Sequence, residues 1–128
     1  MEPSFSKLFT LEEANTLLPE LRKLLEEAAV HRDAMGEKAP QLEPILKTSV
    51  SNGGGRIGSE YGVEAYNLYL VVERIHKLDV FLKDLDIGLL DFPHEWDGRV
   101  VFLCWHPPEE QISYWHEIHA GYRGRQPL

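Results

Sequence analysis

The first third of the chain carries apolar residues at the three- and four-residue spacing of an amphipathic helix. Thr10 and Glu13 precede this stripe at the spacing of a capping box, in which each side chain accepts a hydrogen bond from the other residue's amide. Pro19 interrupts the stripe, and proline is best tolerated at the first position of a helix. The pattern therefore predicts a short helix near residues 11–17 and a long helix near 19–35.

A polar stretch rich in glycine separates this region from a second helical pattern. Residues 36–59 start with a glycine that can end a helix and contain two prolines, which indicates a flexible surface connection. The glycines of 52–58 lack the preceding strand of a phosphate-binding loop, which favours a linker. From residue 59 or 60 to about 83 a broad apolar face predicts a second helix, roughly 35 Å long. The two long helices are expected to form an antiparallel hairpin within 9–83.

The apolar period then changes from helical to strand-like. Three short segments rich in β-branched and aromatic residues follow, IGLLDF (87–92), GRVVFLCW (98–105) and QISYWHEI (111–118). The stretches PHEWD and HPPEE separate them and predict turns, which gives a three-stranded antiparallel meander. The fold class is therefore α+β, with a short N-terminal helix and a helical hairpin packed on a small sheet. We expect a single domain over 1–128, in which 84–128 holds the sheet and an ordered C-terminal clamp.

Strand geometry tests whether the cysteine and the histidines can meet. If 106–110 is the second turn, Cys104 lies opposite Ile112 and Phe102 opposite Tyr114. Cys104 is then roughly 13 Å from His116 along the sheet, too far to share a metal ion. This register favours Cys104 as a small buried apolar residue.

The alternation of side chains also places Asp91 and His116 on the same face, two strands and roughly 10 Å apart. At that separation we expect a ligand or a water molecule to bridge the two side chains, and a direct hydrogen bond between them is less favoured. Arg99 is expected close to both. Arg99, Arg123 and Arg125, together with Asp91, are candidates for binding an anionic ligand.

Three residues near the end of the last strand are candidates for a metal site, namely His116, Glu117 and His119. Nitrogen and oxygen ligands suit zinc, manganese, iron or nickel. On a regular strand His116 and His119 point to opposite faces, so they converge only if the strand ends near Glu117. The alternative is that both histidines are structural and hydrogen-bonded.

Both faces of the predicted sheet are apolar, so each needs a cover. The helices can cover one face, and the C-terminal tail, the short N-terminal helix or a second protomer must cover the other. Exposed Phe92, Trp105 and Trp115 would form a large apolar patch, which makes a homodimer an expected state.

Charge and composition exclude several classes of partner. The 128 residues carry 13 basic and 21 acidic side chains, a net charge of −8, which argues against nucleic acid and against anionic membrane surfaces. Cys104 is the only cysteine, so no internal disulfide forms and a reducing cytoplasm fits. Neither a secretory signal nor a run of about 20 apolar residues is visible. Arg123 and Arg125 follow a strongly acidic segment, and we expect the tail to fold back and pair with it.

Four stretches together resemble a family of small bacterial proteins, the domain-of-unknown-function family 2203. They are FTLEEANTLLPEL (9–21), KDLDIGLLDFP (83–93), GRVVFLCW (98–105) and YWHEIHAGYRGRQPL (114–128). The resemblance implies a helical first half and a compact strand-rich end, and it implies no known activity. By resemblance these residues occupy motif positions: Asp84, Asp91, Arg99, Cys104, Trp105, His116, Gly121, Gly124, Arg125 and Pro127.

Two functions fit these observations. The chain is either a structural or protein-interaction module that forms a homodimer, or a metal- or anion-binding domain with a site around His116. In the second case an enzyme, for example a hydrolase, would use His116 as a general base or a metal ligand. We favour the interaction module as the description of most residues, and the metal- or anion-binding site as the better explanation of the histidines.

Overall fold

One continuous helix, α1 (Leu11–Thr48), is the first element of the fold. The computed structural model describes residues 4–48 and 55–128. The capping box is confirmed, because the Glu13 amide donates to the Thr10 hydroxyl at 3.1 Å and the Thr10 amide donates to the Glu13 carboxylate at 2.8 Å. The predicted separate helix at 11–17 is wrong.

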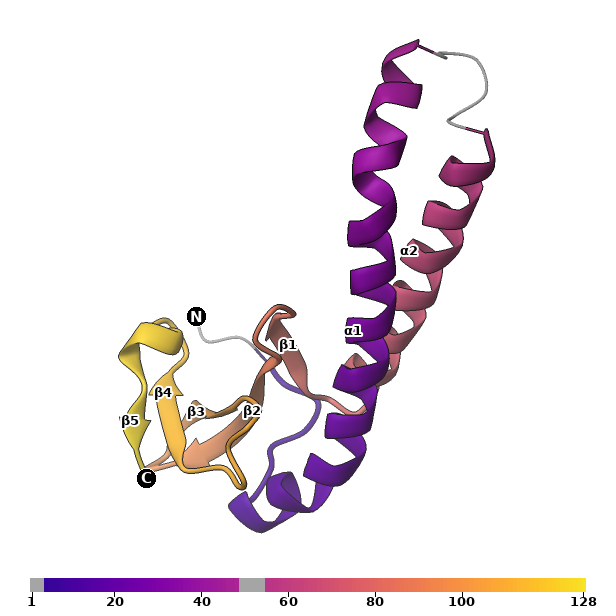
Figure 1. The fold of residues 1–128 in the computed structure, drawn as a ribbon. Coiled ribbons are helices and arrows are strands. Elements are labelled where there is room, and N and C mark those ends of the chain that lie inside the picture. The colour runs from indigo at the N-terminus through magenta and orange to yellow at the C-terminus, as the bar shows by residue number, and fades with distance from the viewer. Residues whose placement is uncertain (1–3, 49–54) are drawn as a thin grey trace.

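The helix passes through both residues that were expected to interrupt it, Pro19 and Gly36. Figure 1 shows the first turns of α1 at an angle to the rest, which is how a helix accommodates an internal proline. Gly36 lies on an exposed part of the helix, where an interior glycine costs only about 1 kcal/mol.

The second helix, α2 (Gly55–His76), packs antiparallel to α1, so the predicted hairpin is confirmed. It begins earlier than expected, since Gly55 and Gly58 are helical, while residues 49–54 lie outside the described part of the chain. It also ends earlier, at His76 instead of about residue 83. Asp79 adopts the left-handed conformation with φ of 66°, which turns the chain away from the helix.

The sheet has five antiparallel strands in sequence order, not three. The central meander is confirmed, and an additional short strand flanks it on each side. The described strands are β1 (Phe81–Asp84), β2 (Leu89–Trp96), β3 (Arg99–Trp105), β4 (Tyr114–Glu117) and β5 (Gln126–Pro127). A 3-10 helix, η1 (Tyr122–Gly124), precedes β5 and belongs to the C-terminal tail.

The hairpin between β2 and β3 is tighter than predicted. Trp96 pairs with Arg99, so the loop consists only of Asp97 and Gly98, with φ of 53° and 74°. Two consecutive left-handed residues match the twist of the flanking strands, and Asp-Gly suits them well. The expected turn at 93–97 is therefore wrong, because β2 continues to Trp96.

The register between β3 and β4 is shifted by two residues from the expected one. Cys104 pairs with Tyr114, and Phe102 pairs with His116. The connecting loop is longer than 106–110, since the buried Ile112 belongs to the core and its amide donates to Asn15 of α1 at 2.8 Å. A shift of two residues keeps the side chains that pair between β3 and β4 on their predicted faces.

One face of the sheet packs on α1 and forms the main core. Phe92, Trp105 and Trp115 lie there and are at most 8% exposed, so within one chain they form no open patch. The other face is covered by the N-terminal segment, where Phe5 packs edge-on against Phe102, and by Arg125 of the tail, which lies over the Tyr114 ring. Within the described residues, neither helix has the length and apolarity that a membrane span requires.

Candidate functional site

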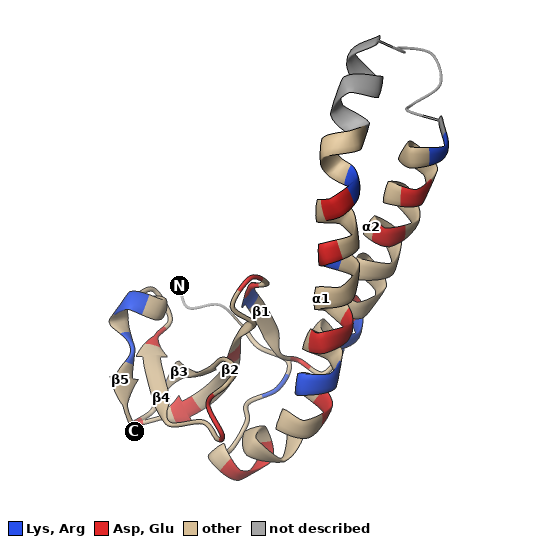
Figure 2. Cartoon of the chain, in the orientation of Figure 1, with Lys and Arg blue, Asp and Glu red and all other residues tan. Residues whose placement is uncertain are grey.

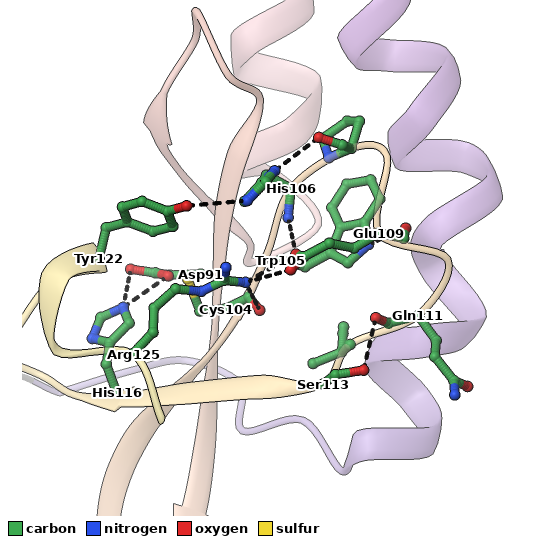
Figure 3. Close-up of polar contacts among 12 residues, drawn as sticks. Asp91, Cys104, Trp105, His106, Glu109, Gln111, Ser113, His116, Tyr122 and Arg125 are labelled. Atoms are coloured by element: carbon green, nitrogen blue, oxygen red, sulfur yellow. Dashed lines mark hydrogen bonds and ion pairs between the residues drawn. The ribbon is translucent and has the colours of Figure 1, made fainter. Parts of the chain in front are cut away.

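Three polar or ionisable side chains lie together in the interior on the tail-covered face of the sheet. Asp91 of β2 is directly opposite Cys104 of β3, and His116 of β4 lies one diagonal step away. Their possible metal-ligating atoms are all within 4.8 Å of one another, and each residue is at most 2% exposed. We call Asp91, Cys104 and His116 the buried cluster (Figure 3). It is the one such group of three in the described part of the chain.

This arrangement corrects two expectations. Cys104 is not too far from His116, because the actual register brings the two within one diagonal step. Asp91 and His116 are not separated by 10 Å either, since Nε2 of His116 lies 3.0 Å from both carboxylate oxygens of Asp91. The strong twist and close packing of a small sheet let a long imidazole side chain reach across β3.

The hydrogen bonds of His116 define its protonation. Its Nδ1 lies 2.7 Å from the backbone carbonyl of Glu117, which only accepts, so Nδ1 donates. Its Nε2 faces the Asp91 carboxylate and donates as well. Burial by itself lowers the pKa of His116, but the hydrogen bonds to Asp91, to the Cys104 thiol and to the carbonyl outweigh it and raise the pKa to about 10.

The same bonds argue against a cysteine nucleophile activated by histidine. A general base needs a free ring nitrogen that faces the thiol, whereas both nitrogens of His116 already hold partners. Cys104 is also fully buried, so no substrate reaches it in this conformation. The buried cluster therefore fits a role inside the fold better than acyl-transfer chemistry.

Arg125 closes the cluster from the tail side. Its Nη2 donates to both carboxylate oxygens of Glu109, at 2.9 and 3.0 Å, and to the Cys104 carbonyl at 3.2 Å. Its guanidinium carbon lies 4.1 Å from the centre of the Tyr114 ring and 5.0 Å from that of Tyr122. The expectation that the tail folds back onto acidic residues is confirmed for Arg125 (Figure 3).

The other candidate residues lie elsewhere. Arg99 and Glu117 form an ion pair on the opposite, helix-packed face of the sheet, and Arg99 holds the pKa of Glu117 below its usual range. His119 is exposed in the turn after β4, and Arg123 is exposed in η1. Of the proposed metal ligands and anion-binding residues, the structure brings Asp91 together with His116 on one face of the sheet and Arg99 together with Glu117 on the other.

The sequence contains a local signal that places Cys104 in the site, although the expected register excluded it. The dipeptide Asp97-Gly98 is a strong marker of a two-residue hairpin. Counting outward from that turn pairs Trp96 with Arg99 and Asp91 with Cys104, as observed.

An open groove of about 660 Å³ runs along α1 beside the loops of the sheet. Two arginines line it, but Arg22 donates to the carbonyls of Glu109 and Glu110, and Arg32 donates to the carbonyl of Leu85. These arginines hold the loops against the helix, so the groove presents no preformed anion site.

Comparison with known families gives one match, which covers nearly the whole chain. The family model described as "Uncharacterized conserved protein (DUF2203)" matches residues 7–128. No curated protein matches the chain, and no solved structure does. The matched range includes both helices, the sheet and every residue of the buried cluster.

Proposed function

The chain belongs to domain-of-unknown-function family 2203, and on that premise we propose that it is a structural and protein-interaction module that forms a homodimer. The observation that carries the proposal is an apolar surface on the outer side of the helical hairpin. We call it the hairpin face, and it consists of Val30, Val63, Tyr66, Tyr69 and Leu70.

Much of the hairpin extends away from the sheet (Figure 1). Among the side chains that the structure describes, Ala28 is the last buried residue of α1 and Val71 is the first buried residue of α2. Among 29–41 and 56–70, no side chain that the structure describes is fully buried. Two helices that pack only on each other bury one side each, and helices of this kind gain most of their stability from tertiary packing. The outer part of the hairpin therefore lacks a second layer.

The hairpin face has the chemistry of an interface. Val63, Tyr66 and Leu70 follow a helical spacing on one side of α2, and the Tyr66 and Tyr69 rings stack with their centres 6.3 Å apart. Tyr66 is 62% exposed, and tyrosine is among the residues that contribute most to protein interfaces. Val30 of α1 extends the surface, since the Glu27–Arg74 ion pair joins the two helices on that side.

A second copy of the chain suits this face. Antiparallel pairing of two α2 helices sets Val63 of each copy against Leu70 of the other and places Tyr66 near the symmetry axis. The same pairing brings Glu60 of one copy close to Arg74 of the other. Figure 2 shows residues of both charges along the hairpin. Two hairpins joined in this way make a four-helix bundle.

Sedimentation velocity on the full chain tests the proposal. We expect a dimer at micromolar concentration and a monomer for Leu70→Glu, because a buried unpaired carboxylate is unfavourable. Ile87→Glu is a matched control, since Ile87 is 41% exposed and Leu70 is 42% exposed, but Ile87 lies between β1 and β2. A wild-type chain that stays monomeric across the micromolar range, or equal effects of the two substitutions, would overturn the proposal.

A further inference from the structure

We propose that Asp91, Cys104 and His116 form a closed structural site for a divalent transition-metal ion, and that zinc is the ion their donor atoms fit best. The three residues come from the adjacent strands β2, β3 and β4. A mixture of sulfur, nitrogen and carboxylate oxygen is the ligand chemistry of zinc in proteins. The site is independent of the hairpin face and adds a function to the proposed dimer.

The distances within the buried cluster are close to those around a bound ion. With zinc bonds of about 2.0–2.3 Å, neighbouring ligand atoms of a tetrahedral site lie roughly 3.3–3.7 Å apart. Nε2 of His116 is 3.0 Å from each Asp91 oxygen, and all three ligand atoms are within 4.8 Å of one another. Each of the three residues offers one donor atom, because the two oxygens of the Asp91 carboxylate are too close together to fill two corners of a tetrahedron.

His116 is oriented in the way that metal-ligating histidines usually are. Its Nδ1–H donates to the Glu117 carbonyl at 2.7 Å, which fixes the ring and directs Nε2 toward Asp91 and Cys104. Outer-sphere bonds of this kind to a backbone carbonyl select the tautomer that presents the other nitrogen to the metal. The regular backbone of three paired strands holds the donors in place (Figure 3).

The ligands themselves can balance the charge of a divalent ion. Without the ion, Nε2 of His116 is hydrogen-bonded to both oxygens of Asp91. With the ion, Nε2 and the thiol each lose a proton to solvent, and the carboxylate and thiolate together balance the two positive charges. An ion held in this way adds no unpaired charge to the low-dielectric core.

The burial of the cluster assigns the ion a structural role. Asp91, Cys104 and His116 are at most 2% exposed, the Phe102 ring packs against His116, and Arg125 covers the cluster from the tail side. Catalytic zinc sites keep one coordination position open to water or substrate, whereas a cluster as deeply buried as this one gives a substrate no access. The ion would tie β2, β3 and β4 to one another.

The test uses the full chain without a polyhistidine tag, expressed with zinc in the medium because the folded site is closed to solvent. We expect about one zinc per chain, and an X-ray absorption spectrum of the wild-type protein with one sulfur neighbour among nitrogen or oxygen neighbours. Cobalt-loaded protein should show a thiolate-to-cobalt charge-transfer band. This wild-type spectroscopy does not depend on whether any variant folds.

Variants assign the ligands. Cys104→Ser should lose the charge-transfer band and most of the zinc, whereas Glu117→Gln and His119→Ala should keep both, since these residues lie outside the cluster. Circular dichroism confirms that each variant is folded. Zinc below about a tenth of an ion per chain, a coordination shell without sulfur, or full zinc content in folded Cys104→Ser would each refute the site.

Discussion

Asp91 and His116 face each other across the width of β3, with Nε2 of the imidazole 3.0 Å from both oxygens of the carboxylate. The two residues lie on strands that do not pair directly, so their contact joins β2 to β4. Both are almost fully buried. Burying a charged pair costs desolvation free energy, and removing one partner costs more, because the other charge is then buried without a counter-charge. Substitutions at this contact should therefore change the stability of the fold.

The metal-free protein should lose stability as the solution becomes alkaline. The folded pKa of His116, about 10, lies above its ordinary value of 6.5. A raised folded pKa contributes stability that is fully present below pH 6.5 and is lost as the pH rises through 10. The free energy of unfolding should therefore fall by about 1.4 kcal/mol per pH unit between these limits. Urea unfolding in the presence of a chelator measures this slope.

The matched control for that slope is His116→Asn, which removes the titrating group. Asp91 and Cys104 face the His116 ring, and Arg125 lies behind Cys104. The variant keeps these three residues, so a difference in slope between the two proteins reports the titration of His116. A wild-type slope no steeper than that of His116→Asn over this range would contradict the assignment.

Asp91→Ala should destabilise the metal-free fold by about 3–5 kcal/mol, because it leaves the His116 imidazolium buried without a counter-charge. The pair can be separated from simple packing with a double-mutant cycle. Asp91→Leu combined with His116→Leu should cost clearly less than the sum of the two single substitutions. Chemical denaturation of the four proteins gives the coupling energy, and a value near zero would show that the two residues act independently.

The face of each strand residue was predictable, but its position along the sheet was not. The alternation of apolar and polar residues placed Asp91 and His116 on one face, and the structure agrees. A register error of two residues preserves that alternation, so the pattern alone cannot detect it. The register depends instead on the tertiary burial of Ile112 against α1, which shortens β4 and lengthens the loop before it.

The helix boundaries show the same limit. The capping box at Thr10 is a local hydrogen-bonded motif, and it was read correctly. The end of α2 was misplaced, because Leu82 continues the apolar period of the helix although it belongs to β1. The left-handed turn at Asp79 interrupts that period without a glycine to mark it. The two-residue strand β5 forms only because β4 is there to pair with it.

The C-terminal tail should contribute stability through Arg125 and not through Arg123. Arg125→Ala removes a two-oxygen ion pair with Glu109 and the bond to the Cys104 carbonyl, so we expect a loss of about 2 kcal/mol. Arg123→Ala is the control, since this exposed residue should change stability by less than about 0.5 kcal/mol. Thermal unfolding of both variants distinguishes them, and similar losses for the two would contradict a specific clamp.

The Asp97-Gly98 turn sets the pairing of Asp91 with Cys104, so its backbone should matter beyond its exposed position. Gly98→Ala should destabilise the fold by about 1 kcal/mol, because alanine is strained at the φ of 74° that Gly98 adopts. A steric clash does not contribute, since an added Cβ meets nothing within 4 Å. Gly36→Ala should have the opposite sign, a gain of up to about 1 kcal/mol, since Gly36 is helical and equally uncrowded.

Chemical denaturation of these two glycine variants measures both effects on the same scale. Because the surroundings of both glycines are open, packing cannot account for a difference in sign, and only the backbone conformation remains as the cause. If Gly98→Ala were neutral, the turn would tolerate another backbone geometry, and the register that opposes Asp91 and Cys104 would need a different origin.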